Sequence, residues 1–252
     1  CGGLLDRLDG MSLGNDPALN GEAVRVLVSR PGFSRFRMLH LGRCPVGDAG
    51  CRAVSESMHV TGLEAVALTR AGVSGEGIAE LLSSERLPAL TTLMLPRSDL
   101  DAAAVAAFTA SAPVTPLARL DLSYSPIGDA GVGLLAQSAL ISGLTHLRCN
   151  ECGIGDAGAV LLAAANVASL RQLDLGRNRI TDDGAAALAR SPQLAKLERL
   201  NVSFNNLTDT GALALAELPG LKPYGLTLHG NGVSKRAEKK IEAVLEARRK
   251  SR

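Results

Sequence analysis

Two cysteines separated by two residues are the first candidates for chemistry in this sequence. Cys149 and Cys152 have the spacing of half a zinc site or of a thiol–disulfide pair. A zinc site needs a second pair of ligands, and a redox pair needs a helix start beside it. Neither accompanies this motif, and Cys149 occupies a leucine position of a repeating pattern. We therefore expect a structural role for both cysteines and no metal.

The other reactive side chains are scattered along the chain. The four histidines, His40, His59, His146 and His229, show no spacing typical of a catalytic triad or a metal site, although His40 and His146 are expected on an exposed face of a sheet. No phosphate-binding loop or dinucleotide-binding glycine motif is present. The sequence thus predicts a protein that is not an enzyme and that needs no cofactor.

Composition favours many small layers over one large core. The 252 residues are 46% hydrophobic but include only four Phe, two Tyr and no Trp. The net charge is +2, and residues 234–252 alone carry +5, which leaves the rest close to neutral at −3. The residues before 234 therefore lack the basic face of a nucleic-acid-binding protein, so we expect no nucleic-acid partner.

The cysteines and the first residue indicate the cellular compartment in which the protein is expected. Five cysteines without regular spacing argue against a disulfide scaffold, so a reduced, cytoplasmic location is expected. Cys1 in first place is typical of a fragment or of a processed lipoprotein. We favour the fragment, and a lipid-anchored or secreted protein is the alternative.

One uncharged stretch approaches the length of a membrane span. It runs over residues 130–147, but it contains Gln137, Ser138 and His146 and crosses a repeat boundary. We interpret it as a helix, loop and strand, and expect no transmembrane segment.

An internal repeat organises nearly the whole chain. The pattern L-x-x-L-x-L-x-x-N-x-I recurs at intervals of 26 to 28 residues, with starts at Leu8, Phe36, Leu63, Leu90, Leu117, Leu144, Leu170, Leu197 and Pro223. Nine matches to the pattern at so constant a period indicate a solenoid built from stacked units.

Each repeat changes its hydrophobic period midway. Leu173 and Leu175 alternate with polar neighbours, as in a short half-buried strand, whereas Ala185 and Leu188 further on follow helical spacing. A helix-start signal lies between the two, as Gly47-Asp48, Gly128-Asp129, Gly155-Asp156, Thr181-Asp182 and Thr208-Asp209. We expect these oxygen-bearing side chains to cap the helix that they begin, and the glycine two residues later to allow close helix packing.

The L-x-x-L-x-L-x-x-N core is followed by a Gly-Asp-Ala-Gly helix start. In these motifs the chain resembles the leucine-rich repeat family, most closely its ribonuclease-inhibitor-type subclass in a bacterial-looking variant. The resemblance covers Leu8 to Val233 and implies a right-handed α/β solenoid, a horseshoe with parallel strands on the concave face and helices on the convex face. It also implies a buried Asn amide that bonds adjacent turns. Only Asn178, Asn205 and Asn231 keep this Asn; Asp16, Cys44, Ala71, Ser98, Ser125 and Cys152 replace it, so a weaker ladder is expected in the first six repeats.

The proposed domain organisation is an array of about nine repeats over residues 1–233 and a capping helix over 234–252. Ser234 is the expected N-cap, and Ala237, Ile241, Val244 and Leu245 form one apolar stripe. The basic residues Arg248, Arg249, Lys250 and Arg252 fit a soluble cap; binding of anionic lipid or nucleic acid is the alternative.

Variable side chains between and after the strand leucines should form columns on the concave face. The candidate partner-binding residues are Arg43, Arg70, Arg97, Tyr124, Arg148, Arg177 and Phe204. Arg beside an aromatic residue is the composition of interface hot spots, and solvated surface side chains without a partner are the alternative.

The sequence therefore favours a monomeric adaptor, inhibitor or scaffold that binds an unidentified protein partner on its concave face. Three alternatives stay open. A GTPase activator would act through an Arg or a loop, but no loop insertion stands out. The run Gly211-Ala212-Leu213-Ala214 resembles the recognition part of a bacterial effector or ubiquitin-ligase adaptor, which an upstream F-box would favour. A lipid-anchored surface protein depends on Cys1.

Overall fold

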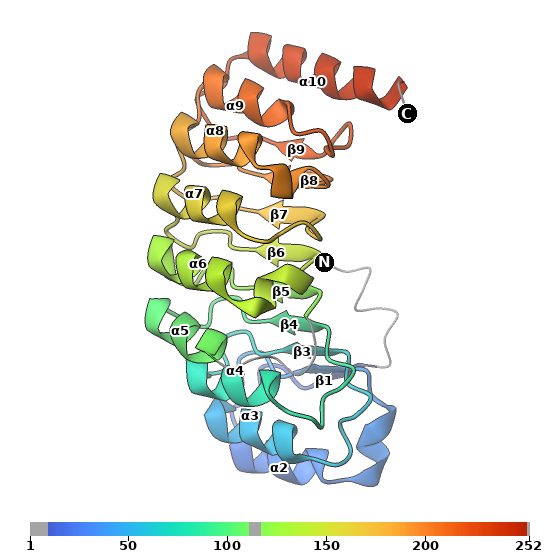
Figure 1. Cartoon of the computed structure of the whole chain (residues 1–252). Helices are drawn as coiled ribbons and strands as arrows, with labels where there is room; N and C mark the ends of the chain where they lie inside the picture. The colour runs from blue at the N-terminus through green and yellow to red at the C-terminus, as the bar shows by residue number, and fades with distance from the viewer. Residues whose placement is uncertain (1–9, 111–116, 251–252) are drawn as a thin grey trace. The chain divides into compact units, whose positions relative to one another are not determined.

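Figure 1 shows the computed structural model of the chain, which describes residues 10–110 and 117–250, with the side chains of 249 and 250 left out. Contacts divide the chain into two compact units, Cys1–Ser125 and Pro126–Arg252. Both are stretches of α/β solenoid, as predicted. The expectations for Cys1, Leu8 and Arg252 fall outside the described residues.

Short strands and helices alternate in the first unit. The strands are β1 (Gly10–Ser12), β2 (Met38–His40), β3 (Ala65–Ala67), β4 (Thr92–Met94) and β5 (Arg119–Asp121), and the helices are α2 (Gly21–Val28), α3 (Gly47–Glu56), α4 (Gly75–Leu82) and α5 (Ala102–Ala110). The strands pair in parallel and in sequence order, with Leu39 beside Val66 and Val66 beside Leu93.

The second unit repeats this plan. Its strands are β6 (His146–Arg148), β7 (Gln172–Asp174), β8 (Arg199–Asn201) and β9 (Leu226–Thr227), and its helices are α6 (Gly128–Gln137), α7 (Asp156–Ala164), α8 (Asp182–Arg190), α9 (Asp209–Ala216) and α10 (Lys235–Lys250). Parallel pairing sets Leu147, Leu173, Leu200 and Leu226 side by side. Helices α6 to α9 stack next to one another in one layer, and α10 packs on α9 (Figure 1).

The strand leucines and the helix stripes form the core between the sheet and the helices. Leu173 and Leu175 are buried on the strand side, and Ala185 and Leu188 on the helix side of the same repeat. Polar Asp174, between the two leucines, is only half-buried. The change from period 2 to period 3.6 therefore located both layers correctly.

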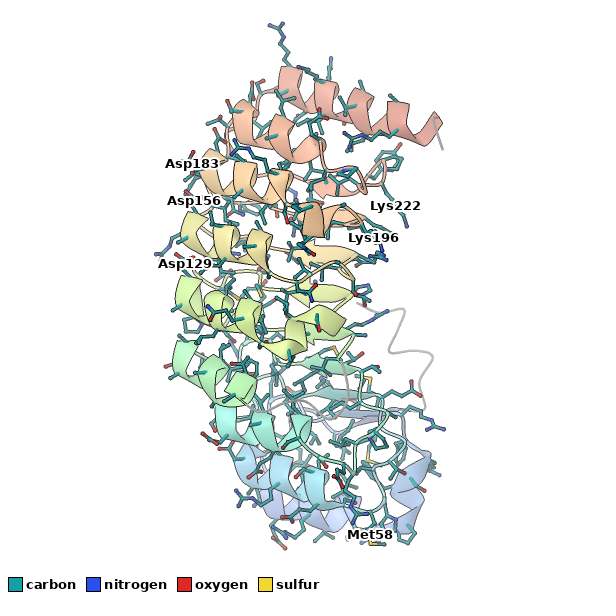
Figure 2. All side chains as sticks on the ribbon, viewed as in Figure 1. Met58, Asp129, Asp156, Asp183, Lys196 and Lys222 are labelled. Carbon is teal, nitrogen blue, oxygen red and sulfur yellow. The ribbon has the colours of Figure 1, made fainter. Side chains whose placement is uncertain are left out.

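Each helix-start aspartate caps the helix of the following repeat. Asp129 Oδ1 accepts hydrogen bonds from the Gly155 and Gly158 N–H groups at 2.7 and 3.0 Å. Asp156 accepts in the same way from Thr181 and Gly184 in the next repeat. Figure 2 labels Asp129 and Asp156 at the starts of successive helices. For these carboxylates, the expectation that each caps its own helix was wrong, because the first free N–H groups of the neighbouring helix lie within reach.

The glycine of the helix start makes room for this carboxylate. A Cβ atom on Gly158 would lie 2.5 Å from Asp129 Oδ1, and one on Gly184 would lie 2.4 Å from Asp156 Oδ1. The predicted close packing is thus the packing of a helix backbone on an aspartate of the preceding repeat.

The asparagine ladder lies in the second unit. Asn178 Oδ1 accepts from the N–H groups of Cys152 and Ile154, both at 3.0 Å, and its Nδ2 donates to the carbonyl of Cys149 at 2.8 Å. Asn205 and Asn231 make equivalent bonds. In the first unit, Cys44 donates its thiol to Leu13 and Ser98 its hydroxyl to Leu68. Each substitute makes fewer bonds, as the sequence predicted.

Candidate binding surface

A column of side chains follows the strands, at the turn where each strand ends. We call it the turn column: Asn15, Arg43, Arg70, Arg97 and Tyr124 in the first unit, and Glu151, Arg177, Phe204 and Gly230 in the second. Every member has a positive φ, between 50° and 74°. The sequence placed these residues in one column but did not reveal this backbone conformation.

Main-chain pairing imposes the left-handed conformation. The Arg97 N–H donates to the Ser123 carbonyl at 2.8 Å, and the Arg177 N–H donates to the Ser203 carbonyl at 2.7 Å. These bonds continue the strand ladder for one more residue while the chain turns towards the helix. The same bond to the following repeat is made by Asn15, Arg43, Glu151 and Phe204, whichever side chain is present.

This backbone favours residue types that the column mostly lacks. Glycine adopts positive φ without cost and asparagine at little cost, whereas other L-residues pay on the order of 1 kcal/mol. Only Asn15 and Gly230 are of the favoured types. The arginines, the two aromatic residues and Glu151 therefore occupy these positions against the local conformational preference.

Each unit contains an arginine stacked on an aromatic ring of the column. Arg97 Cζ lies 4.2 Å from the centroid of the Tyr124 ring, and Arg177 Cζ lies 4.4 Å from that of Phe204. The His229 ring meets Phe204 edge-on at 4.9 Å. Tyr124 is 37% and Phe204 42% exposed, so both rings remain accessible. These platforms combine a flat apolar surface with a fixed positive charge.

The remaining arginines of the column are less constrained. Arg43 Nη1 donates to Asn15 Oδ1 at 3.3 Å, and Arg70 is exposed and makes no side-chain hydrogen bond within residues 10–110 and 117–250. Stacked arginines at this spacing would repel one another, but Arg97 stacks on Tyr124 of the next repeat and Arg43 is hydrogen-bonded to Asn15 of the preceding repeat.

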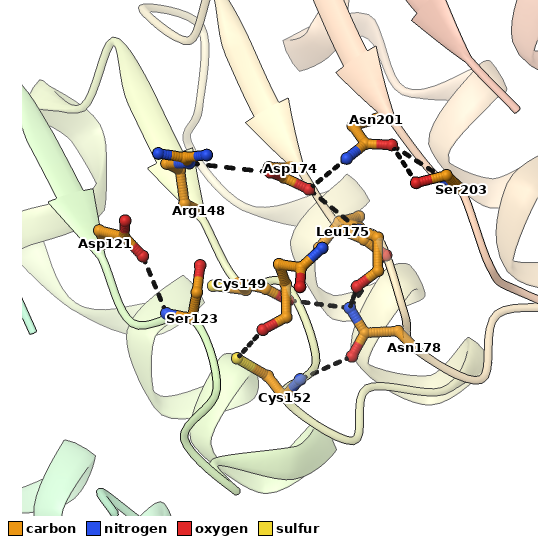
Figure 3. A network of polar contacts seen from close by, with 12 residues as sticks. Asp121, Ser123, Arg148, Cys149, Cys152, Asp174, Leu175, Asn178, Asn201 and Ser203 are labelled. Carbon is orange, nitrogen blue, oxygen red and sulfur yellow. Dashed lines mark hydrogen bonds and ion pairs between the residues drawn. The ribbon is translucent and has the colours of Figure 1, made fainter. Parts of the chain in front are cut away.

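Arg148 belongs to a different arrangement on the sheet of the second unit. Its Nε lies 3.7 Å from Asp174 Oδ2, while Asp174 Oδ1 accepts from Asn201 Nδ2 at 2.8 Å. Asn201 Oδ1 in turn accepts from the Ser203 hydroxyl at 2.7 Å, as the chain of contacts in Figure 3 shows. The charge of Arg148 is thus balanced within its own layer, unlike that of Arg70.

Sequence reasoning missed an apolar cluster on the sheet of the first unit. Met38, Ala65 and Ala67 lie on the side opposite the core leucines, yet they are at most 4% exposed, and Met94 packs against them. The signal was present as Met and Ala at alternate strand positions, where polar residues were expected. His229, which supports Phe204, was also missed.

The four cysteines that the structure describes are all buried. Cys149 and Cys152 are buried, in line with a structural role. Burial raises the pKa of Cys51 to about 12, with a further contribution from Asp48 and Glu80, so its thiolate does not form at neutral pH. Within the described ranges, no three His, Cys, Asp or Glu side chains gather as metal ligands.

Comparison with known proteins identifies the repeat. A family model described as Leucine Rich repeat matches residues 115–136, 168–189 and 193–216. Leucine-rich repeats are therefore detected in these three segments. A search of curated proteins gives no match. The ribonuclease-inhibitor-type assignment stays a prediction.

Two solved structures share the fold at low identity. Internalin C2 from Listeria monocytogenes aligns with a TM-score of 0.58 and 21% identity, over 87% of this chain and 80% of that one. The Rad7 and Elc1 complex in yeast aligns with a TM-score of 0.62 and 19% identity, over 91% of this chain and 65% of that chain. At these identities the comparison shows the fold alone. Among the helices that the structure describes, none has the length and hydropathy needed to cross a bilayer.

Proposed function

We propose that this protein is a binding module that holds a protein partner through the turn column. The observation that carries the proposal is the occurrence of Arg, Tyr and Phe where the backbone favours Gly or Asn. The positive-φ backbone disfavours these residue types, and their exposed side chains make few hydrogen bonds with the described residues. Their use is therefore explained by what they contact outside it.

The chemistry of the column indicates the kind of partner. Arg43, Arg70 and Arg97 present three positive charges from successive repeats, and Tyr124 adds an exposed ring. Acidic groups on a partner would offset the repulsion between these cations, and the stacked Arg97 and Tyr124 form a rigid anchor. We infer a partner surface with carboxylates around an apolar centre. The yeast Rad7 structure, which shares the fold, is itself of a complex with a second protein.

Site-specific photo-crosslinking tests this proposal directly. A benzophenone amino acid placed at Arg70 is expected to capture a partner from cell extract, with yields that fall as salt rises because the charges are exposed. The same amino acid at Arg190, an exposed arginine on helix α8, is the control. Equal capture from both positions, or capture at Arg190 alone, would contradict the assignment of the turn column.

A further inference from the structure

The last strand of the second unit ends the sheet with an open edge. In the portion of the chain that the structure describes, β9 pairs only with β8. The N–H groups of Leu200, Val202 and Phe204 donate to the carbonyls of Gly225, Thr227 and His229 at 2.7, 3.0 and 2.8 Å. This is the ladder that joins each repeat to the next one.

The corresponding donors of the last repeat have no acceptor. They belong to Leu226, Leu228 and Gly230, for which no bond beyond the pairing of β9 with β8 occurs among the described residues. The asparagine ladder stops at the same place. Asn205 and Leu207 donate their N–H groups to Asn231 Oδ1, both at 3.1 Å, whereas the N–H groups of Asn231 and Val233 meet no further asparagine within the described part of this unit. These five backbone N–H groups occupy the positions from which other repeats bond to the repeat that follows them.

The apolar side of this edge is only partly covered. Leu226 and Leu228 are half-buried, whereas their counterparts Leu200 and Val202 are 1% and 0% exposed. Helix α10 shelters the helix layer: Ala237, Ile241 and Leu245 are buried on it, as predicted from the sequence.

The cap also explains one residue of the basic tail. Arg248 Nη1 donates to the carbonyls of Ala216 and Leu218 at 2.7 and 2.8 Å, where helix α9 ends. Arg248 therefore serves the cap and is not available as a ligand-binding cation. Helix α10 packs mainly on α9.

We propose that the β9 edge is a docking site for an extended segment of a protein partner, which adds as a parallel strand. The donors specify its chemistry. Backbone carbonyls at alternate residues would accept from Leu226, Leu228 and Gly230, and apolar side chains between them would cover the two leucines. A side-chain amide oxygen three residues after the second apolar residue would accept from Asn231 and Val233.

Local features limit indiscriminate pairing at this edge. Strand β9 has only two residues, and Pro223 and the exposed Lys222 precede it. Short edges with proline and lysine resist aggregation, so a segment must match the whole row of donors to bind. The site shares Gly230 with the turn column but uses its backbone N–H, whereas the turn column is proposed to act through side chains, so either proposal can fail without the other.

A peptide with the chain's own sequence over residues 170–180 is a suitable probe, because it carries Leu173, Leu175 and Asn178 in the required spacing. Amide NMR of the full-length protein should show saturable shifts at Leu226, Leu228 and Gly230 and slower hydrogen exchange there. A peptide with Asn178→Ala should bind about tenfold more weakly, since it loses the side-chain acceptor. A peptide with both leucines replaced by Asp should not bind.

Two matched variants of the protein locate the site. Leu228→Lys places a charge at the partly covered edge and should weaken peptide binding at least about tenfold, whereas Thr227→Lys, on the other face of the same strand, should leave it within about twofold. Circular dichroism checks that both variants fold. The proposal is overturned if the Asp-substituted peptide binds equally well, if shifts map elsewhere, or if these amides exchange slowly without peptide. Self-association of the protein in place of peptide binding would also overturn it.

Discussion

Replacing Asp182 by Ala tests how the repeats hold one another. Asp182 accepts hydrogen bonds from the Thr208 N–H at 2.8 Å, from the Thr208 hydroxyl and from the Gly211 N–H at 3.0 Å. All three donors belong to the next repeat. The substitution removes the acceptor for the start of helix α9, and lost caps of this kind cost about 1–2 kcal/mol. For a unit of this length, that lowers the melting temperature by about 4–8 °C.

The pH dependence supplies a second signature of the same contact. Burial tends to raise the pKa of Asp182, but the hydrogen bonds from Thr208 and Gly211 together outweigh it and hold the pKa below its ordinary value. A carboxyl with a lowered pKa stabilises the fold fully above its unfolded pKa of about 4 and loses that contribution on acidification through the folded value. The difference between wild type and Asp182→Ala should therefore shrink as the pH falls below about 4.

The neighbouring Asp183 provides the matched control. It carries the same charge in the same first turn, is exposed, and accepts no hydrogen bond from the described residues of the following repeat. Thermal unfolding followed by circular dichroism at pH 7 and at pH 3 compares the two variants. If Asp183→Ala destabilises the protein as much as Asp182→Ala does, the inter-repeat cap is not the cause and the reasoning is refuted.

Four further substitutions or reactions probe the packing of the repeats. Gly211→Ala should destabilise by about 1–3 kcal/mol despite the helix preference for Ala, because its Cβ would lie 2.3 Å from Asp182 Oδ1; a stabilised variant in urea unfolding would contradict this. Asn205→Ala should cost about 3 kcal/mol in the same assay, since it leaves the Ile180 N–H and several carbonyls without partners; a loss below about 1 kcal/mol would argue against the ladder. Ser125→Ala should be neutral or stabilising by about 1 kcal/mol, because the buried Ser125 hydroxyl has no acceptor in the described structure, and a clear loss of stability would speak against that. Cys51 should react with iodoacetamide at pH 8 only after denaturant is added, as mass spectrometry would show, whereas rapid labelling of the folded protein would be inconsistent with its burial.

The sequence predicted the layers because each layer has its own period. Leu173 and Leu175 alternate and Ala185 and Leu188 follow helical spacing, so strand and helix could both be placed within a repeat of about 27 residues. Asn178 could be recognised from the family resemblance as a bonding amide. These features depend on side-chain type and local spacing alone.

Contacts between repeats could not be predicted in the same way. Whether Asp156 caps its own helix or the next one depends on how closely neighbouring helices approach, which no single repeat encodes. The positive φ of Arg97 and Phe204 arises from main-chain bonds to the following repeat, although neither residue type favours it. The buried position of Ala65 opposite the core was likewise missed, because alternation alone predicts exposure there.

We propose that the turn column serves binding at the expense of backbone preference. A variant with Arg97→Gly and Tyr124→Gly tests this proposal, because glycine removes both side chains from positions with φ of 58° and 62°. Its unfolding free energy and its affinity for the captured partner are measured together, with Arg190→Ala as the control for lost charge. We predict that stability is unchanged or rises by about 1–2 kcal/mol while binding falls at least about tenfold. A variant that loses stability and still binds as wild type would contradict the account.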